Sequence, residues 1–145
     1  MVDVGKKPVT ARSALARAWV RFPPGLRARI LAGAGPKGPI EEVARCAGIL
    51  AAKRTAELIP MCHPLGLDQV EILFEPLGED LLEIRCRANC AGKTGVEMEA
   101  LTGAALAALT VYDMTKGLDH GIRIERIELV EKSGGKSGTW RAPDS

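Results

Sequence analysis

The first candidates for acid–base chemistry, judged by residue type and spacing, are Asp113 and Lys116. They lie three positions apart in a stretch with helical periodicity, so their side chains share one face of the predicted helix. A carboxylate and an amine in this arrangement can move protons on a bound substrate if their surroundings shift their pKa values. The apolar run from Leu106 to Val111 leads into the pair and predicts a partly buried environment. The same spacing also occurs in ordinary surface ion pairs, which stabilise a helix only slightly.

A second candidate is the tripeptide 92–94, Gly-Lys-Thr, between a predicted strand and a predicted helix. It matches the second half of a phosphate-binding P-loop, but Arg87 stands where the first glycine is required. The similar tripeptide 135–137, Gly-Lys-Ser, has Val130 at that position. Neither match is complete. Only half of the motif therefore supports the alternative that the chain is a P-loop hydrolase. A lysine beside glycines ahead of a helix still predicts an anion site.

The cysteines and a loop histidine are the third candidates. Cys62 and His63 are adjacent, which is not a usual spacing for metal ligands. Buried thiols therefore explain the cysteines better than a metal site does. His63 stands between Pro60 and Pro64, where a structural and a functional histidine are equally compatible with the sequence. The four cysteines, for which we expect free thiols, are Cys46, Cys62, Cys86 and Cys90.

Length and composition limit the function classes. The 145 residues predict one domain, residues 1–145, with flexible ends at about 1–10 and 133–145. The 20 Lys and Arg nearly balance 18 Asp and Glu, and aromatics are only 3%, so we expect no nucleic-acid partner. The longest apolar run, Ala104–Val111, is too short to span a membrane. The opening residues 1–7, MVDVGKK, include no apolar region of the kind that serves as a secretion signal, so we expect a cytoplasmic protein.

These candidates must be positioned by a small set of predicted elements. Alternating apolar residues predict strands, apolar residues at helical spacing predict helices, and the glycine-rich passage 33–39 predicts a loop. The order indicates an α+β ferredoxin-like sandwich, an antiparallel sheet with helices packed on one face. The predicted elements are strand 13–22, helices 26–31 and 40–59, a hairpin of strands 70–74 and 82–88, helix 96–116 and strand 122–129.

Two local details refine this prediction. Thr94 and Glu97 have the spacing of a capping box, which predicts the start of the long helix. The alternation of the last strand is interrupted near Arg126, where we expect an irregularity in the sheet.

Several long segments, in the same order and spacing, resemble the cyclic pyranopterin monophosphate synthases of molybdenum cofactor biosynthesis. The opening Met1–Val4 also resembles that family, so the resemblance covers nearly the whole chain. The segments that carry it are Ala51–Thr55, Leu58–Leu65, Gly92–Thr102, Ala107–Met114 and Lys132–Gly138.

The resemblance implies a lyase that converts a cyclised dihydroguanosine triphosphate into cyclic pyranopterin monophosphate and diphosphate. It implies Asp113 as the catalytic acid or base and Lys116 as its partner. We expect no cofactor; assistance by magnesium is compatible with the sequence but is not indicated by it. Cations that could hold the phosphates are Lys53, Arg54, Lys93, Lys132 and Lys136. The expected substrate-binding residues are Met61, Cys62, His63, Glu97, Met98, Glu99, Lys37, Lys53 and Lys132.

The spacing of two of these residues bears on assembly. Glu97 and Asp113 are sixteen residues apart on one predicted helix, about 24 Å at about 1.5 Å per residue. One small substrate cannot touch both in one chain, so we expect a site shared between subunits. The resemblance implies a homohexamer, a trimer of dimers. A non-catalytic nucleotide-binding module with the same fold is the remaining alternative.

Overall fold

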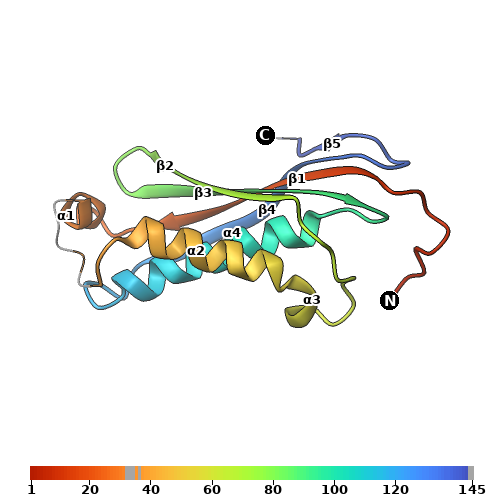
Figure 1. The fold of residues 1–145 in the computed structure, drawn as a ribbon. Helices are drawn as coiled ribbons and strands as arrows, with labels where there is room; N and C mark the ends of the chain where they lie inside the picture. The colour runs from red at the N-terminus through yellow and green to blue at the C-terminus, as the bar shows by residue number, and fades with distance from the viewer. Residues whose placement is uncertain (32–34, 36, 144–145) are drawn as a thin grey trace.

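The computed structural model describes residues 1–31, 35 and 37–143. Within them an antiparallel sheet has the strand order β2-β3-β1-β4-β5, and helices α2 and α4 pack on one face (Figure 1). This confirms the predicted ferredoxin-like α+β fold. The strands are β1 (Thr10–Arg21), β2 (Gln69–Leu77), β3 (Leu81–Gly92), β4 (Arg123–Ser133) and β5 (Trp140–Arg141). The helices are α1 (Leu26–Arg29), α2 (Ile40–Lys53), α3 (Thr55–Leu58) and α4 (Glu97–Thr115).

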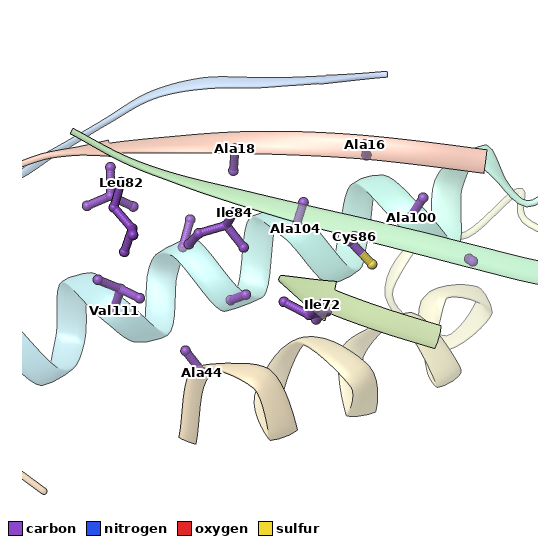
Figure 2. Close-up of a cluster of buried hydrophobic side chains, with 14 of the residues drawn as sticks. Ala16, Ala18, Ala44, Ile72, Leu82, Ile84, Cys86, Ala100, Ala104 and Val111 are labelled. Atoms are coloured by element: carbon purple, nitrogen blue, oxygen red, sulfur yellow. The ribbon is translucent and has the colours of Figure 1, made fainter. Parts of the chain in front are cut away.

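Strand β1 lies at the centre of the sheet, and its predicted alternation is confirmed. Ala14, Ala16, Ala18 and Val20 are at most 1% exposed and face the helices. Because three of these four side chains are single methyl groups, α4 can pack close to the strand (Figure 2). The core therefore combines small residues of β1 and α4 with larger side chains of β2 and β3, such as Ile72 and Ile84.

The contact between α2 and α4 is equally close. A Cβ atom at Gly48 of α2 would lie 2.7 Å from the carbonyl oxygen of Gly103 in α4. A Cβ atom at Gly103 would in turn lie 2.6 Å from the Cys86 sulfur of β3. Larger residues at either position would push α4 away. These glycines fix the axis of the helix that carries candidate residues at both ends.

Two predictions about helix boundaries are wrong. The helix expected over residues 40–59 is broken at Arg54, and the buried Thr55 hydroxyl donates to the Ala52 carbonyl at 2.9 Å. This bond satisfies a carbonyl group that the end of α2 leaves without a helical partner. The predicted capping box at Thr94 is absent because Val96, which has no polar side-chain atom, precedes the first residue of α4.

The other sequence expectations have mixed outcomes. The irregularity near Arg126 is confirmed, since the pairing of β1 with β4 shifts register between Arg126 and Ile124. Strand β5 was not predicted; it pairs with β4 within the tail. In the glycine-rich passage, residues 33, 34 and 36 lie outside the described residues, as does neighbouring residue 32.

The cysteines agree with the expected free thiols. Cys86 and Cys90 are both buried and lie on the same face of β3. Burial raises the pKa of the Cys86 thiol to about 12, so it stays protonated and inert at neutral pH. Among the described helices, none combines the length and the hydropathy needed to cross a membrane.

Candidate functional site

A cleft of about 610 Å³ lies where two glycine- and lysine-containing loops meet at one end of the sheet. The first loop, Gly92–Gly95, joins β3 to α4, and the second, Ser133–Ser137, follows β4. Sheet register explains why they meet: Thr10 of β1 is opposite Gly92, and Ser13 is opposite Ser133. The start of β1 therefore lies between the loops. We call this site the basic cleft.

Positive charge dominates the basic cleft. Among the described residues that line it, five are basic and Glu97 is the one carboxylate. The two Gly-Lys-Thr/Ser tripeptides, which the sequence presents as separate fragments, place Lys93 and Lys136 on the same cavity. Backbone amides, hydroxyl groups and lysines suit a ligand with several phosphate oxygens. The basic residues are Lys7, Arg12, Lys93, Lys132 and Lys136.

Glu97 is paired inside the basic cleft. Lys132 Nζ donates to Glu97 Oε1 at 2.8 Å, and both side chains are about one-third exposed or less. Burial acts to raise the pKa of Glu97, but the hydrogen bonds from Lys132 and the backbone outweigh it and lower the pKa. The carboxylate also lies against Gly95, where a Cβ atom would clash with both of its oxygens. Glu97 is thus ionised and held in one place.

A second cavity of about 370 Å³ adjoins the basic cleft and shares Lys7, Thr94, Gly95 and Glu97 with it. We call it the side cavity. Its lining combines apolar side chains with His63 and two carboxylates, an environment that fits a flat polar heterocycle. The remaining lining residues are Val2, Val4, Met61, Cys62, His63, Leu65, Met98 and Glu99.

Glu99 is the buried acid of the side cavity. It is only 3% exposed, and burial is the main cause that raises its pKa, with the negative charge of Glu97 acting in the same direction. Burial and the charge of Glu99 also raise the pKa of the Cys62 thiol. Glu97 and Glu99 therefore differ in acidity although they are neighbours. Such a difference lets one carboxyl group donate a proton while the other stays ionised.

The N-terminal residues cross the mouth of the side cavity. His63 Nε2 lies 2.8 Å from the Val2 carbonyl oxygen, and Lys93 Nζ donates to the Gly5 carbonyl at 2.8 Å. Lys7, a little further along, lines both cavities. The expected flexibility of residues 1–10 stays a prediction.

Asp113 lies at the other end of α4, in a cluster with Lys116 and Lys37. Lys116 Nζ and Lys37 Nζ each lie 2.8 Å from an Asp113 carboxylate oxygen. Lys37 also donates to the Asp113 backbone carbonyl at 3.0 Å. The hydrogen bond from Lys116, followed by that from Lys37, lowers the pKa of Asp113 to about 2. The same pairing raises the pKa of Lys116.

The prediction that Asp113 and Lys116 are partly buried is wrong. Their side chains are 53% and 47% exposed, because the buried residues of the preceding run, Ala107, Ala108 and Val111, lie on another face of α4 and this pair lies at the helix end. Their shifted acidity comes from ion pairing, with no contribution from burial in that direction.

The structure separates the predicted site residues into two groups. Met61, Cys62, His63, Glu97, Met98, Glu99 and Lys132 gather around the two adjoining cavities. Asp113, Lys116 and Lys37 gather sixteen residues further along α4, about 24 Å away. Lys53 lies in neither group and lines a small separate cavity beside Leu67.

Two lining residues of the basic cleft, Lys7 and Arg12, were missed by sequence reasoning. Arg12 occurs at the start of a strand and Lys7 precedes Pro8, so neither belongs to a recognisable motif. The available signal was topological. Once β1 is placed between β3 and β4, residues at its start must approach both loops.

The fold and the two cavities define a ferredoxin-like α+β protein with a basic cleft beside a partly apolar, acidic cavity. The profile of the MoaC family matches residues 1–135, and the chain belongs to that family.

Its relatives include the cyclic pyranopterin monophosphate synthase of Thermomicrobium roseum, which is 54% identical over 145 residues, 99% of this chain and 87% of the relative. The protein of that name from Chloroflexus aurantiacus is 53% identical over 99% of this chain and 88% of its own. That of Listeria monocytogenes is 54% identical over 98% and 89%, respectively.

Proposed function

We propose that this protein is a cyclic pyranopterin monophosphate synthase. It converts (8S)-3',8-cyclo-7,8-dihydroguanosine 5'-triphosphate into cyclic pyranopterin monophosphate and diphosphate. The observation that carries the proposal is the junction of the basic cleft with the side cavity. A triphosphate and a heterocycle joined by a sugar need adjoining sites of these two kinds. Identity of 54% with a synthase of this name over 99% of the chain supports the same activity.

The basic cleft binds the triphosphate in this proposal. Lys93, Lys132 and Lys136 donate to phosphate oxygens, and their charge stabilises the diphosphate as it leaves. Lys132 is held in position by its hydrogen bond to Glu97. A sugar hydroxyl oxygen, losing its proton, bonds to the α-phosphorus as the bond from that phosphorus to the leaving diphosphate breaks, which forms the cyclic phosphate. We propose that these side chains act without a bound metal ion or cofactor.

The side cavity receives the guanine-derived ring. Met61, Leu65 and Met98 offer apolar contact to its faces, and Glu99, whose pKa is raised, can donate to or accept from its polar edge. Rearrangement of the ring needs protons to be moved, and His63 and Glu99 line the cavity where this would occur.

The Asp113 cluster, which we assign to acid–base catalysis, is brought to this site by a second subunit. Residue 105 is midway between 97 and 113, and there α4 presents Ala105 between Leu101 and the 51%-exposed Leu109. A two-fold axis through Ala105 pairs α4 with its copy in antiparallel orientation. The Asp113 end of one helix then approaches the Glu97 end of the other.

Burial in such an interface would also change the acidity of Asp113. A pKa of about 2 makes the exposed carboxylate a weak base. Removing water from the carboxylate acts to raise that pKa, whereas the two lysines act to lower it, and we assign Lys116 as the proton donor. We extend the assembly to a hexamer, a trimer of dimers, in the cytoplasm, as the family resemblance implies.

One assay separates this proposal from its alternatives. The purified protein is incubated with the cyclised triphosphate, and diphosphate and the cyclic phosphate are quantified. Equal amounts of both products are expected. Binding without product would identify a non-catalytic module, and magnesium-dependent release of inorganic phosphate from ATP or GTP would identify a P-loop hydrolase; either result would overturn the proposal.

A further inference from the structure

Arg12 lies between the two loops of the basic cleft and contacts both. It lies near the start of β1, and its guanidinium donates through Nε to the Gly92 carbonyl at 3.3 Å and through Nη2 to the Lys93 carbonyl at 3.4 Å. These bonds reach the loop between β3 and α4. The guanidinium of Arg12 therefore hydrogen-bonds to the backbone of Lys93, whose side chain lines the basic cleft.

The other loop packs on the same side chain. A Cβ atom at Gly135 would clash with Arg12 Nη1, and one at Gly134 would clash with the Ala11 carbonyl oxygen and lie 3.2 Å from Arg12 Cδ. Both glycines also have positive φ angles, 100° at Gly134 and 72° at Gly135. The backbone of the second loop thus lies directly on the guanidinium, with no room for a side chain between them.

We propose that Arg12 is a positioning residue that bridges the two loops and sets the spacing between Lys93 and the Lys132–Lys136 segment. The proposal rests on the proposed function, for which the spacing of these cations matters. A planar guanidinium can donate to two carbonyls while presenting its other edge to the second loop. A lysine carries its N–H donors on a single nitrogen, so it lacks the planar fork that donates to the first loop while its other edge faces the second loop. The charge of Arg12 also favours the ionised form of Glu97.

Amide hydrogen exchange on the assembled protein without ligand tests the bridge directly. In Arg12→Ala, exchange at residues 93–95 and 134–137 is expected to become at least about tenfold faster, while α2 keeps its protection. A residue that only contacted phosphate would leave exchange in the ligand-free protein unchanged. Unchanged exchange in both loops would overturn the proposal. Arg12→Lys, which keeps the charge and the aliphatic stem, serves if Arg12→Ala does not fold, and the same acceleration is expected.

Gly135 and Gly138, which both follow β4, provide a matched pair of variants. Gly135→Ala and Gly138→Ala impose similar backbone strain, because their φ angles are 72° and 64°, but a Cβ at Gly138 meets nothing within 4 Å. Titration calorimetry with diphosphate is expected to show affinity reduced at least about threefold more by Gly135→Ala than by Gly138→Ala. In the Arg12→Ala background this difference disappears. If it persists there, Gly135 acts independently of Arg12 and the proposal fails.

Kinetics connect the bridge to the reaction. Phosphate contacts hold both the ground state and the transition state, so Arg12→Lys is expected to raise KM several-fold with a smaller change in kcat. A loss confined to kcat would contradict a positioning role. Because exchange and diphosphate binding need no turnover, a wild-type protein that forms no cyclic phosphate would refute the proposed function and leave the bridge to be judged on its own measurements.

Discussion

Glu97 and Asp113 belong to the same helix, and each is ionised and paired with lysine, yet they lie at its opposite ends. Glu97 is half-buried beside Lys132 in the basic cleft, whereas Asp113 is exposed between Lys37 and Lys116. The distance of about 24 Å between them exceeds the reach of one small substrate. This relationship leads to two predictions about catalysis.

Asp113→Asn should remove turnover and preserve the fold. The amide keeps the size of the carboxylate but cannot accept a proton, so we expect kcat to fall by about 10²–10⁴. Substrate affinity, measured by calorimetry, should change little because the basic cleft is intact. Glu57→Gln, a similar change at an exposed position of α3, is the control and should be fully active. Full activity of Asp113→Asn would remove Asp113 from the mechanism.

Subunit mixing tests the shared site. Glu97→Gln and Asp113→Asn are each expected to be inactive alone. After equal amounts exchange subunits at random, about a quarter of the sites combine an intact Glu97 with an intact Asp113, so about a quarter of wild-type activity should return. Native mass spectrometry verifies the exchange. Activity that stays at the level of the separate variants, despite mixed oligomers, would mean that each chain builds its own site.

Gly95→Ala should separate activity from stability. The added Cβ would occupy the place of the Glu97 carboxylate, which can swing away at little cost because it is the end of a flexible side chain. We expect a melting temperature close to wild type but a loss of up to about 10²-fold in kcat/KM, since Glu97 and Lys132 no longer meet. Gly66→Ala, where a Cβ meets nothing within 4 Å, should leave both quantities unchanged. Equal activity of the two variants would show that the placement of Glu97 is unimportant.

The Asp113 ion pairs should appear in the acid limb of the stability curve. The pKa of Asp113 falls from 3.8 to about 2 on folding, so between these values the unfolded chain binds more protons. The contribution of the Asp113 carboxylate to the free energy of unfolding is therefore complete above about pH 4 and is lost as the pH falls towards 2. We expect the melting temperatures of wild type and Asp113→Asn to converge over that interval, and high salt to reduce their difference. A difference independent of pH would contradict this assignment.

Much of the fold follows from local pattern. The alternation in β1 is visible because each buried residue from Ala14 to Val20 alternates with a side chain on the other face of the sheet. The break at Arg54 is not visible, because apolar spacing continues through it and the hydrogen bond made by Thr55 depends on the fold. Strand β5 has two residues, too few to show alternation.

The candidate site was less predictable than the fold. Sequence motifs identified Lys93, Glu97 and Lys132 as site residues, because each belongs to a segment with a recognisable sequence. Arg12 joins them only because β1 pairs with β3 on one side and β4 on the other, and its hydrogen bonds to the first loop join residues 80 and 81 positions apart. The exposure of Asp113 was misjudged because only part of the preceding apolar run is buried, and the helix carries the carboxylate beyond the core.

The single helix α4 acts as a ruler in the proposed assembly. Its length fixes the span between the two reaction centres that it serves, one at each end, and the glycine contact between Gly48 and Gly103 keeps it from sliding. Insertion of one residue within it would turn Asp113 by about 100° and advance it by about 1.5 Å relative to Glu97. Both neighbouring centres would then lose their alignment together, so this segment tolerates exchange of side chains far better than a change in length.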